Sequence, residues 1–245
     1  MPQSQRKPLP KNNGNGPNLK VLYGILGLVA LLGGGWIVYS VKGGGAAAIE
    51  PIELADVASS QELLAMATGI AAGAESGVQV LVFSDFTCPA CQGWAGFIEP
   101  QLKAEYISTN RIKYVYYDFP LGGTDHPWGF IAARAARCAN DQDKFWEYHD
   151  VLFARQNEWA ISRTPPIDQL VDYGELINLG MNAFESCVRS DEHADVVTAN
   201  RMLGDRLGVG ATPTIFIGSR SIPDWRNYDE VKKAIEAELG AGATQ

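Results

Sequence analysis

The pattern of hydrophobic and polar positions changes several times along the chain, and each pattern predicts a different element. The segment "VQVLVFS" at residues 78–84 is apolar and β-branched, which predicts a short buried strand. The next segment, "PACQGWAGFIEPQLKAEYI", has the pattern of a helix, with Pro89 in its first turn and Pro100 expected to kink or restart it. Residues 111–119, "RIKYVYYDF", predict a second strand.

A long helical region separates these two strands from the last ones. Between about residues 126 and 207, apolar side chains recur at helical spacing. "GVGATPTIFIG" then predicts a strand entered through Pro213, a short strand is expected near 220–222, and "DEVKKAIEAEL" predicts an amphipathic closing helix. The order is α/β: a βαβ unit and a ββα unit with helices inserted between them, over residues 78–240.

The N-terminal part has a different pattern. Residues 21–41, "VLYGILGLVALLGGGWIVYSV", contain no charged side chain, and as a helix they span roughly 30 Å, the thickness of a bilayer core. We therefore predict a single N-terminal transmembrane helix. A cleaved signal peptide is the alternative, because "GGGAAA" at residues 43–48 offers small residues for cleavage, although a signal peptide usually has only about 7–15 apolar residues.

Charge predicts the orientation of this segment. Residues 1–20 hold four of the chain's 20 basic residues and none of its 28 acidic residues, and we interpret them as a disordered tail. The positive-inside rule places this tail in the cytoplasm and the rest of the chain outside it. Residues 42–77 are expected to form a tether with a short helix around "SSQELLAMATGIA". An acidic domain argues against a nucleic-acid partner, whose binding requires basic side chains.

The candidate chemistry lies in "FSDFTCPAC", where two cysteines follow the first strand. Cys88 is expected at the mouth of the helix and Cys91 one turn inside it. A helix N-terminus carries partial positive charge and free N–H groups, which favour a thiolate, so the pKa of Cys88 should be lowered. Cys88 is thus the candidate nucleophile for disulfide exchange, and Cys91 the candidate resolving thiol. Two inert buried thiols are the structural alternative.

A zinc site is a further alternative for the cysteine pair, and it requires four ligands, usually as two close pairs. Cys138 and Cys187 are single and distant from each other in the sequence. The histidines show no ligand spacing: we interpret His126 as a loop residue, His149 as half-buried packing and His193 as part of an exposed helix. The sequence therefore predicts neither a metal nor a cofactor.

Three segments together resemble one known family. "FSDFTCPAC", "AARCANDQDKFWEYHDVLF" and "GVGATPTIFIG" are similar to the DsbA-type thiol:disulfide oxidoreductases of the thioredoxin superfamily, and most similar to the membrane-tethered, BdbD-like branch. The resemblance covers about residues 66–240 and implies a thioredoxin fold with a helical insertion at about 126–207. It also implies that Pro213 is cis, that Thr212 and Pro213 face the active-site disulfide and bind substrate, and that Cys138 and Cys187 form a structural disulfide.

The chain departs from the family pattern at two places. Relatives usually carry a buried acid six residues before the first cysteine, a group thought to accept a proton from the buried cysteine, and here that position is Val82. Asp85 is nearby, but we interpret it as a solvated residue at the end of a strand. The dipeptide Pro89-Ala90 lacks the histidine of the strongest oxidants, so the resemblance implies a less extreme oxidant.

We therefore expect an extracytoplasmic, membrane-anchored thiol:disulfide oxidoreductase that donates its Cys88–Cys91 disulfide to reduced exported proteins. A membrane partner of the DsbB or VKOR type would reoxidise it. A disulfide reductase or isomerase of the same fold is one alternative. A thioredoxin-like module that binds clients without catalysis is another, although a pure binder has no need of the thiols in "CPAC".

Overall fold

A mixed sheet carries the functional loops in the computed structural model, which describes residues 64–242. Within these residues five strands pair in the order β1-β3-β2-β4-β5. Strands β2 and β3 are parallel, and all other neighbours are antiparallel. The strands are β1 (Ile70–Gly73), β2 (Val78–Ser84), β3 (Ile112–Asp118), β4 (Thr214–Ile217) and β5 (Arg220–Ser221).

One interrupted helix follows β2 and carries the cysteine pair at its start. It consists of α3 (Pro89–Gly93), the π-helical turn η1 (Trp94–Ile98), α4 (Glu99–Leu102) and the π-helical turn η2 (Lys103–Ile107). The prediction that the helix restarts near Pro100 is confirmed, since α4 begins at Glu99 with Pro100 in its first turn. Proline cannot donate a backbone hydrogen bond, and the π-helical turn before it changes the bonding pattern at that point.

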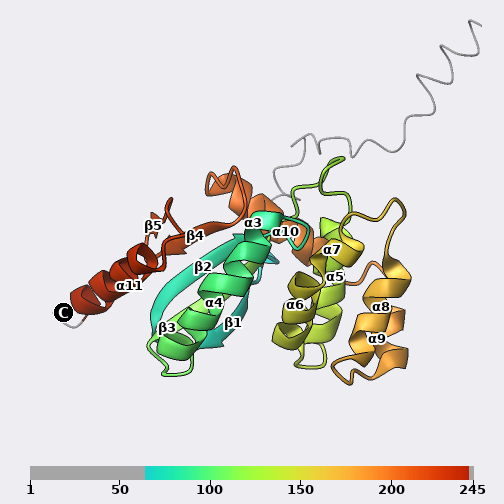
Figure 1. The fold of residues 1–245 in the computed structure, drawn as a ribbon, viewed down its shortest axis with the longest axis horizontal. Helices are drawn as coiled ribbons and strands as arrows, with labels where there is room; N and C mark the ends of the chain where they lie inside the picture. The colour runs from blue at the N-terminus through green and yellow to red at the C-terminus, as the bar shows by residue number, and fades with distance from the viewer. Residues whose placement is uncertain (1–63, 243–245) are drawn as a thin grey trace, which may run out of the picture. The chain divides into compact units, whose positions relative to one another are not determined.

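The remaining helices form an insertion between β3 and β4 and a closing helix. They are α5 (Gly129–Asn140), α6 (Phe145–Ala154), α7 (Gln156–Trp159), α8 (Ile167–Glu175), α9 (Met181–Val188), α10 (Ala194–Arg206) and α11 (Tyr228–Gly242). Figure 1 shows α5 to α9 standing beside the sheet, while α3 and α4 run across its face. The predicted order of βαβ unit, helical insertion and ββα unit is therefore confirmed.

Apolar side chains divide the fold into three packed regions. One face of the sheet packs against the interrupted helix and α11, with Val82, Trp94 and Ile235 among its buried residues. The other face carries Phe83, which packs with Phe119 and with Leu203 of α10. The helical insertion has its own core, which reaches the cysteine pair. The helix that carries the cysteine pair thus lies where the core of the sheet meets the core of the insertion.

The structure bears out only part of the helix expected around residues 59–71. Residues 59–63 lie outside the described part, residues 64–65 are helical, and residues 70–73 form strand β1, which pairs with β3. A Cβ atom on Gly69 would lie 2.3 Å from the Val115 side chain, so this close approach to β3 requires glycine. The sheet therefore includes residues that the sequence assigned to a tether.

The predicted tail (1–20), the predicted transmembrane helix (21–41) and the first part of the predicted tether lie outside the described residues. Between residues 64 and 242, no helix is long and apolar enough to cross a membrane. The membrane anchor stays a prediction.

A buried ion pair connects β3 with the insertion. Arg137 on α5 donates from Nε to Oδ2 of Asp118 at 2.6 Å, and from Nη2 to the carbonyl oxygen of Thr68 at 2.7 Å. Asn200 on α10 donates to the same two acceptors, each at 3.1 Å. Because buried charges are tolerated when paired and hydrogen-bonded, this network holds the segment before β1, the end of β3 and two inserted helices together.

A disulfide links two helices of the insertion. Cys138 on α5 is bonded to Cys187 on α9, with 5.8 Å between the Cα atoms and a sequence separation of 49. Both helices pack their apolar sides into the core of the insertion, which contains Cys138 itself. This is the pairing that the family resemblance implied, and it leaves Cys88 and Cys91 as the other two cysteines.

Candidate active site

Cys88 and Cys91 lie at the N-terminus of the interrupted helix, and both are thiols in this structure. Cys88 has extended backbone angles and occupies the N-cap position of α3, so Pro89 fills the first helical position. Proline suits this position because its missing N–H would have no partner there. Cys88 is 6% exposed and Cys91 is 0% exposed, so Cys88 is the more accessible of the two.

The surroundings of Cys88 favour its thiolate. A hydrogen bond from the Cys91 thiol lowers the pKa of Cys88 to about 5, and the side chain of Thr212 and the backbone N–H groups of Cys91 and Ala90 act in the same direction. Burial alone opposes this, because it penalises the charged form. The expectation of a lowered pKa is therefore met, and the hydrogen bonds come from both the helix N-terminus and the loop before β4.

Cys91 has the opposite properties. Burial raises the pKa of Cys91 well above its usual range, and the hydrogen bond and negative charge of Cys88 add to this effect. The backbone N–H of Asp85 donates to its sulfur at 3.4 Å. At neutral pH the pair therefore holds one thiolate at the surface and one thiol in the interior, the arrangement that disulfide exchange requires.

The loop between α10 and β4 lies against the first cysteine. The peptide bond between Thr212 and Pro213 is cis, and the Cys88 thiol donates to the carbonyl oxygen of Thr212 at 3.4 Å. No described residue accepts or donates an ordinary hydrogen bond at the buried hydroxyl of Thr212, which is therefore available to the Cys88 thiolate. The structure thus brings together the two segments that the sequence placed far apart.

Gln156 contacts the segment between β2 and α3 that leads into Cys88, and sequence reasoning missed it. This buried residue of α7 donates from Nε2 to the carbonyl oxygens of Phe86 at 2.8 Å and Cys88 at 3.0 Å. It therefore fixes the active-site loop from the side of the helical insertion. A glutamine in a short helix carries no sequence signal for such a role.

Asp85 is buried, which corrects its interpretation as a solvated strand end. It is 1% exposed, and its carboxylate accepts hydrogen bonds from the Thr87 N–H at 2.8 Å, the Thr87 hydroxyl at 2.7 Å and the Leu121 N–H at 2.8 Å. Nδ1 of His126 lies 2.9 Å from the Thr87 hydroxyl oxygen and 3.9 Å from the carboxylate. A Cβ on Gly129 would lie 2.5 Å from Asp85, so the glycine makes room for this cluster.

Comparisons with known proteins agree with this geometry. A family model described as Thioredoxin matches residues 66–237. A probable disulfide bond formation protein D of Bacillus anthracis is 31% identical over 167 residues, which cover 66% of this chain and 74% of the relative. This chain belongs to the DsbA/BdbD-type thiol:disulfide oxidoreductases.

Solved structures of DsbA/BdbD-type proteins have the same fold. The crystal structure of oxidised BdbD from Bacillus subtilis is similar to this DsbA/BdbD-type chain with a TM-score of 0.63 and 25% identity, covering 69% of this chain and 92% of that one. The structure of alpha-DsbA1 from Wolbachia pipientis gives a TM-score of 0.64 at 21% identity, with 76% and 98% covered. The second likeness shows the fold alone.

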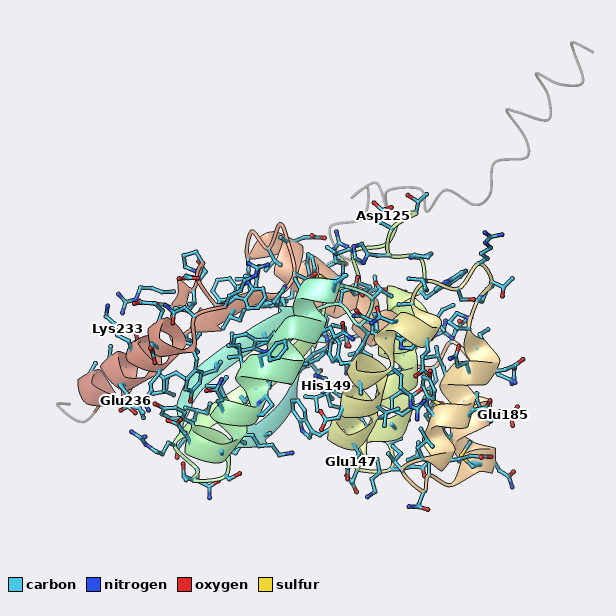
Figure 2. All side chains as sticks on the ribbon, in the orientation of Figure 1. Asp125, Glu147, His149, Glu185, Lys233 and Glu236 are labelled. Atoms are coloured by element: carbon cyan, nitrogen blue, oxygen red, sulfur yellow. A yellow bond between two sulfur atoms is a disulfide. The ribbon has the colours of Figure 1, made fainter. Side chains whose placement is uncertain are left out.

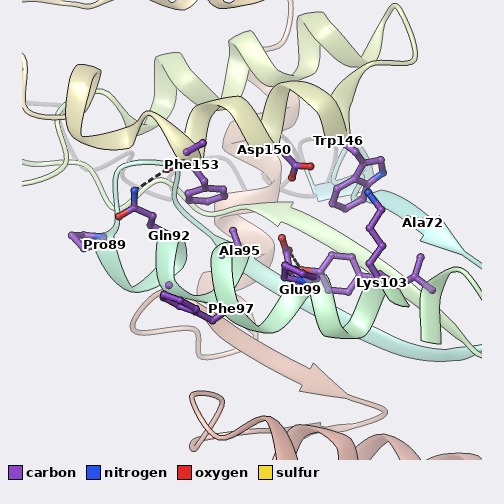
Figure 3. A pocket seen from close by; sticks show the side chains of 16 residues that line it. Ala72, Pro89, Gln92, Ala95, Phe97, Glu99, Lys103, Trp146, Asp150 and Phe153 are labelled. Atoms are coloured by element: carbon purple, nitrogen blue, oxygen red, sulfur yellow. Dashed lines mark hydrogen bonds between the residues drawn. The ribbon is translucent and has the colours of Figure 1, made fainter. Parts of the chain in front are cut away.

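A cleft of about 750 Å³ runs along the active-site helix of this DsbA/BdbD-type protein. Figure 3 shows Pro89 and Gln92 at one end of the cleft and Trp146 and Lys103 toward the other. Most of its lining is apolar, and Phe97, which is 76% exposed, stands beside it. The cleft thus begins at the dipeptide between the cysteines and follows the boundary between the helix and α6.

His149 is more deeply buried than the sequence suggested. It is 0% exposed on α6, and Figure 2 shows its label between α4 and α6. Its Nδ1 lies 3.0 Å from a carboxylate oxygen of Asp150, and its Nε2 lies 3.6 Å from Glu99. Rings of Phe86, Tyr116 and Phe153 surround it. His149 therefore belongs to the packing between the two cores, and Trp94 is likewise a buried core residue.

Two groups of possible metal ligands occur among the described residues, and both include His193, which pairs with Asp141 at 2.7 Å. The first group contains Cys138 and Cys187, whose sulfurs are bonded to each other and are not thiolate ligands. The second is a cluster of exposed acidic groups beside His193. Neither lies near Cys88, so neither belongs to the cysteine site.

Proposed function

We propose that this protein is an extracytoplasmic oxidant that donates a Cys88–Cys91 disulfide to exported proteins. The observation that supports this most directly is the lowered pKa of Cys88 beside the buried Cys91 thiol. A stabilised thiolate stabilises the reduced protein, so the oxidised protein gives its disulfide away readily. The same chemistry is named in the Bacillus relatives, which are called disulfide bond formation proteins.

In the proposed reaction, a client thiolate attacks the Cys88 sulfur of the disulfide. A bond forms between client and Cys88, the Cys88–Cys91 bond breaks, and Cys91 leaves as a thiolate that takes up a proton. A second client thiolate then attacks the client sulfur of the mixed disulfide, and Cys88 leaves as a thiolate. The client loses two electrons and gains a disulfide, and the cysteine pair holds the electrons until it is reoxidised.

Thr212 and Pro213 are the proposed site for the client chain. The carbonyl oxygen of Thr212 lies 3.4 Å from the Cys88 sulfur, so a client segment bound along this loop would carry its cysteine to the reacting atom. An extended client can pair with the loop backbone as an added strand, which gives affinity without demanding a particular client sequence. Such tolerance suits an enzyme that oxidises many different proteins.

The location and the partner are part of the same proposal. The uncharged segment 21–41, with basic residues before it, would anchor the chain and place the cysteines in a compartment where disulfides persist. Continued turnover requires an acceptor for two electrons per cycle. A membrane protein of the DsbB or VKOR type has the chemistry and the location to accept them.

A redox titration of the full chain in glutathione buffers tests the direction of the reaction. We expect a midpoint potential above roughly −200 mV at pH 7. The protein should also oxidise a reduced, unfolded client, and the Cys88→Ala variant should not. A potential below roughly −250 mV, in the range of thioredoxin, would instead assign the reductase alternative.

A separate experiment tests the location. A reporter enzyme that is active only outside the cytoplasm is fused after Gln245 of the full chain. Reporter activity in the membrane fraction is expected. Activity in the soluble extracytoplasmic fraction would show a cleaved signal peptide, and an inactive reporter would contradict export.

A further inference from the structure

Val82, where relatives usually carry a buried acid, lies beside Tyr116 on the neighbouring strand β3. In the parallel register of β2 and β3, Val82 pairs with Tyr116 and Ser84 pairs with Asp118. Paired residues of a sheet project to the same face, and so do residues two apart on one strand. Ser84, Tyr116 and Asp118 therefore share the face on which Val82 lies, and all three are buried.

The serine lies between the buried thiol and the phenol. Ser84 is buried and directly precedes Asp85, whose backbone N–H donates to the Cys91 sulfur at 3.4 Å. The Ser84 hydroxyl favours the charged forms of both neighbouring groups, since it lowers the pKa of Cys91 and the pKa of Tyr116. The tyrosine ring is held in place because it stacks on Phe86 at 5.4 Å between ring centroids and meets the edge of Phe145 at 5.4 Å. Among the described residues none forms an ordinary hydrogen bond with the Tyr116 hydroxyl, so this buried donor is uncommitted while Cys91 is a thiol.

The surroundings of Tyr116 keep its proton in place. Burial raises the pKa of Tyr116 well above its usual range, and the negative charge of Asp118 adds to this effect. Asp118 is itself fixed by Arg137 at 2.6 Å and by Asn200 at 3.1 Å. A phenol that cannot ionise remains a hydrogen-bond donor when a negative charge forms nearby.

We propose that Ser84 is a catalytic donor to the Cys91 sulfur, and that Tyr116 is a positioning residue that orients and polarises the Ser84 hydroxyl. When Cys91 leaves as a thiolate, the Ser84 O–H donates to its sulfur and the Tyr116 O–H donates to the Ser84 oxygen. Successive donors of this kind strengthen one another in a buried site. Two neutral hydroxyl groups thereby stabilise the leaving thiolate at a site where Val82 supplies no acid.

The proposal rests on exchange at Cys88 and Cys91, and it concerns a single step. The incoming thiolate forms a bond with Cys88, the Cys88–Cys91 bond breaks, and the electron pair of that bond moves to the Cys91 sulfur. Ser84 and Tyr116 stabilise this charge until a proton from solvent converts Cys91 to its thiol. At neutral pH neither the disulfide nor the final Cys91 thiol carries the charge, so the hydroxyl groups affect the rate and not the equilibrium.

The test measures the second-order rate constant for reduction of the oxidised full chain by dithiothreitol at pH 7, together with the midpoint potential. Ser84→Ala is expected to slow the reaction about tenfold and Tyr116→Phe about threefold, because hydrogen bonds to charged groups are stronger than neutral ones. The double variant should react at the rate of Ser84→Ala, since Tyr116 acts only through the serine. All midpoint potentials should stay at the wild-type value.

The matched control is Tyr117→Phe, the same chemical change one residue away. Tyr117 pairs with Phe83 across the register and stacks on it at 5.0 Å on the other face of the sheet, so its variant should react at the wild-type rate. Wild-type rates in Ser84→Ala, independent losses that multiply in the double variant, or a potential shift that accounts for the rates would each overturn the proposal. Failure of the proposed function would appear separately, as a wild-type midpoint potential below roughly −250 mV, and would leave the comparison of rates among these variants unaffected.

Discussion

The carbonyl oxygen of Thr212 lies 3.4 Å from the sulfur of Cys88, although the two residues belong to different halves of the sequence. The carbonyl group can accept a hydrogen bond from the thiol but not from the thiolate. The Thr212 hydroxyl can donate to the thiolate, and it lowers the pKa of Cys88. One residue thus orients the protonated sulfur through its backbone and stabilises the charged sulfur through its side chain.

Removing the Thr212 hydroxyl should therefore raise the pKa of Cys88. Thr212→Val keeps the shape of the side chain and deletes the donor, so we expect a rise of about one pKa unit, the effect of one hydrogen bond. The rate of alkylation of the reduced protein as a function of pH measures this value. Thr212→Ser retains the hydroxyl and should stay near the wild type, and equal pKa values in the valine and wild-type proteins would contradict the assignment.

The two thiols should give the midpoint potential a break in its pH dependence. Below the Cys88 pKa of about 5, reduction takes up two protons, and above it only one, because burial keeps Cys91 protonated. The potential should therefore fall by about 60 mV per pH unit below the break and by about 30 mV above it. Redox titrations between pH 4 and 8 measure both slopes. A constant slope through pH 5 would show that Cys88 is not a thiolate in this range.

The lowered pKa of Cys88 also predicts how the stability of the reduced protein changes with pH. The folded pKa of Cys88 lies below its unfolded value, so its thiolate stabilises the reduced fold above the unfolded pKa, and this stability is lost as the pH falls toward 5. The oxidised protein has no such group. We therefore expect the melting temperature of the reduced protein, relative to the oxidised one, to rise between pH 5 and pH 8. Differential scanning calorimetry of both forms measures the difference, and a fall over this range would contradict the assignment.

The Cys138–Cys187 disulfide should act on stability and not on exchange. Its loop of 49 residues restricts the unfolded chain, and loss of such a bond costs about 2–4 kcal/mol. The double variant Cys138→Ser with Cys187→Ser should melt several degrees lower, at roughly 2–4 °C per kcal/mol for a chain of this size. Calorimetry measures this loss. The potential of the Cys88–Cys91 pair should not change, and a large shift would mean that the second pair takes part in electron transfer.

The buried pair of Arg137 and Asp118 should be sensitive to the loss of one partner. Arg137→Met leaves the Asp118 carboxylate buried without its cation, which costs about 3–5 kcal/mol of unfolding free energy. Urea unfolding measures this loss. Arg134→Met on the same helix is the control, because Arg134 pairs with the exposed Asp191 and such pairs contribute at most about 1 kcal/mol. A similar loss of unfolding free energy in both variants would show that the buried pair stabilises the fold no more than the exposed pair does.

Local patterns were sufficient to predict most of the sheet and the position of the cysteine pair. The strand predicted at residues 78–84 has those bounds in the structure, because its run of valine, leucine and phenylalanine is interrupted only by Gln79 and ends at the polar Ser84 and Asp85. The helix start at Pro89 was also clear, since proline is compatible with the first helical turn and with few other helical positions. These features depend on neighbours in the sequence.

The missed features depend on contacts between distant segments. Residues 70–73 contain a single strand former, Ile70, followed by two alanines and a glycine, so the strand depends on pairing with β3. The burial of Asp85 depends on Gly129 and on the Leu121 N–H, which come from another part of the chain. The pairing of Ser84 with Asp118 follows from a register that only the folded sheet defines.

The bond between Cys138 and Cys187 means that this protein must itself acquire a structural disulfide during its maturation. A newly made chain carries four thiols, which can combine in three ways, and only one of them leaves Cys88 and Cys91 paired with each other. Its maturation is therefore subject to the pairing problem that its family solves for other proteins. Under the proposed function, the first molecules would need another oxidant, and later ones could be oxidised by copies already present.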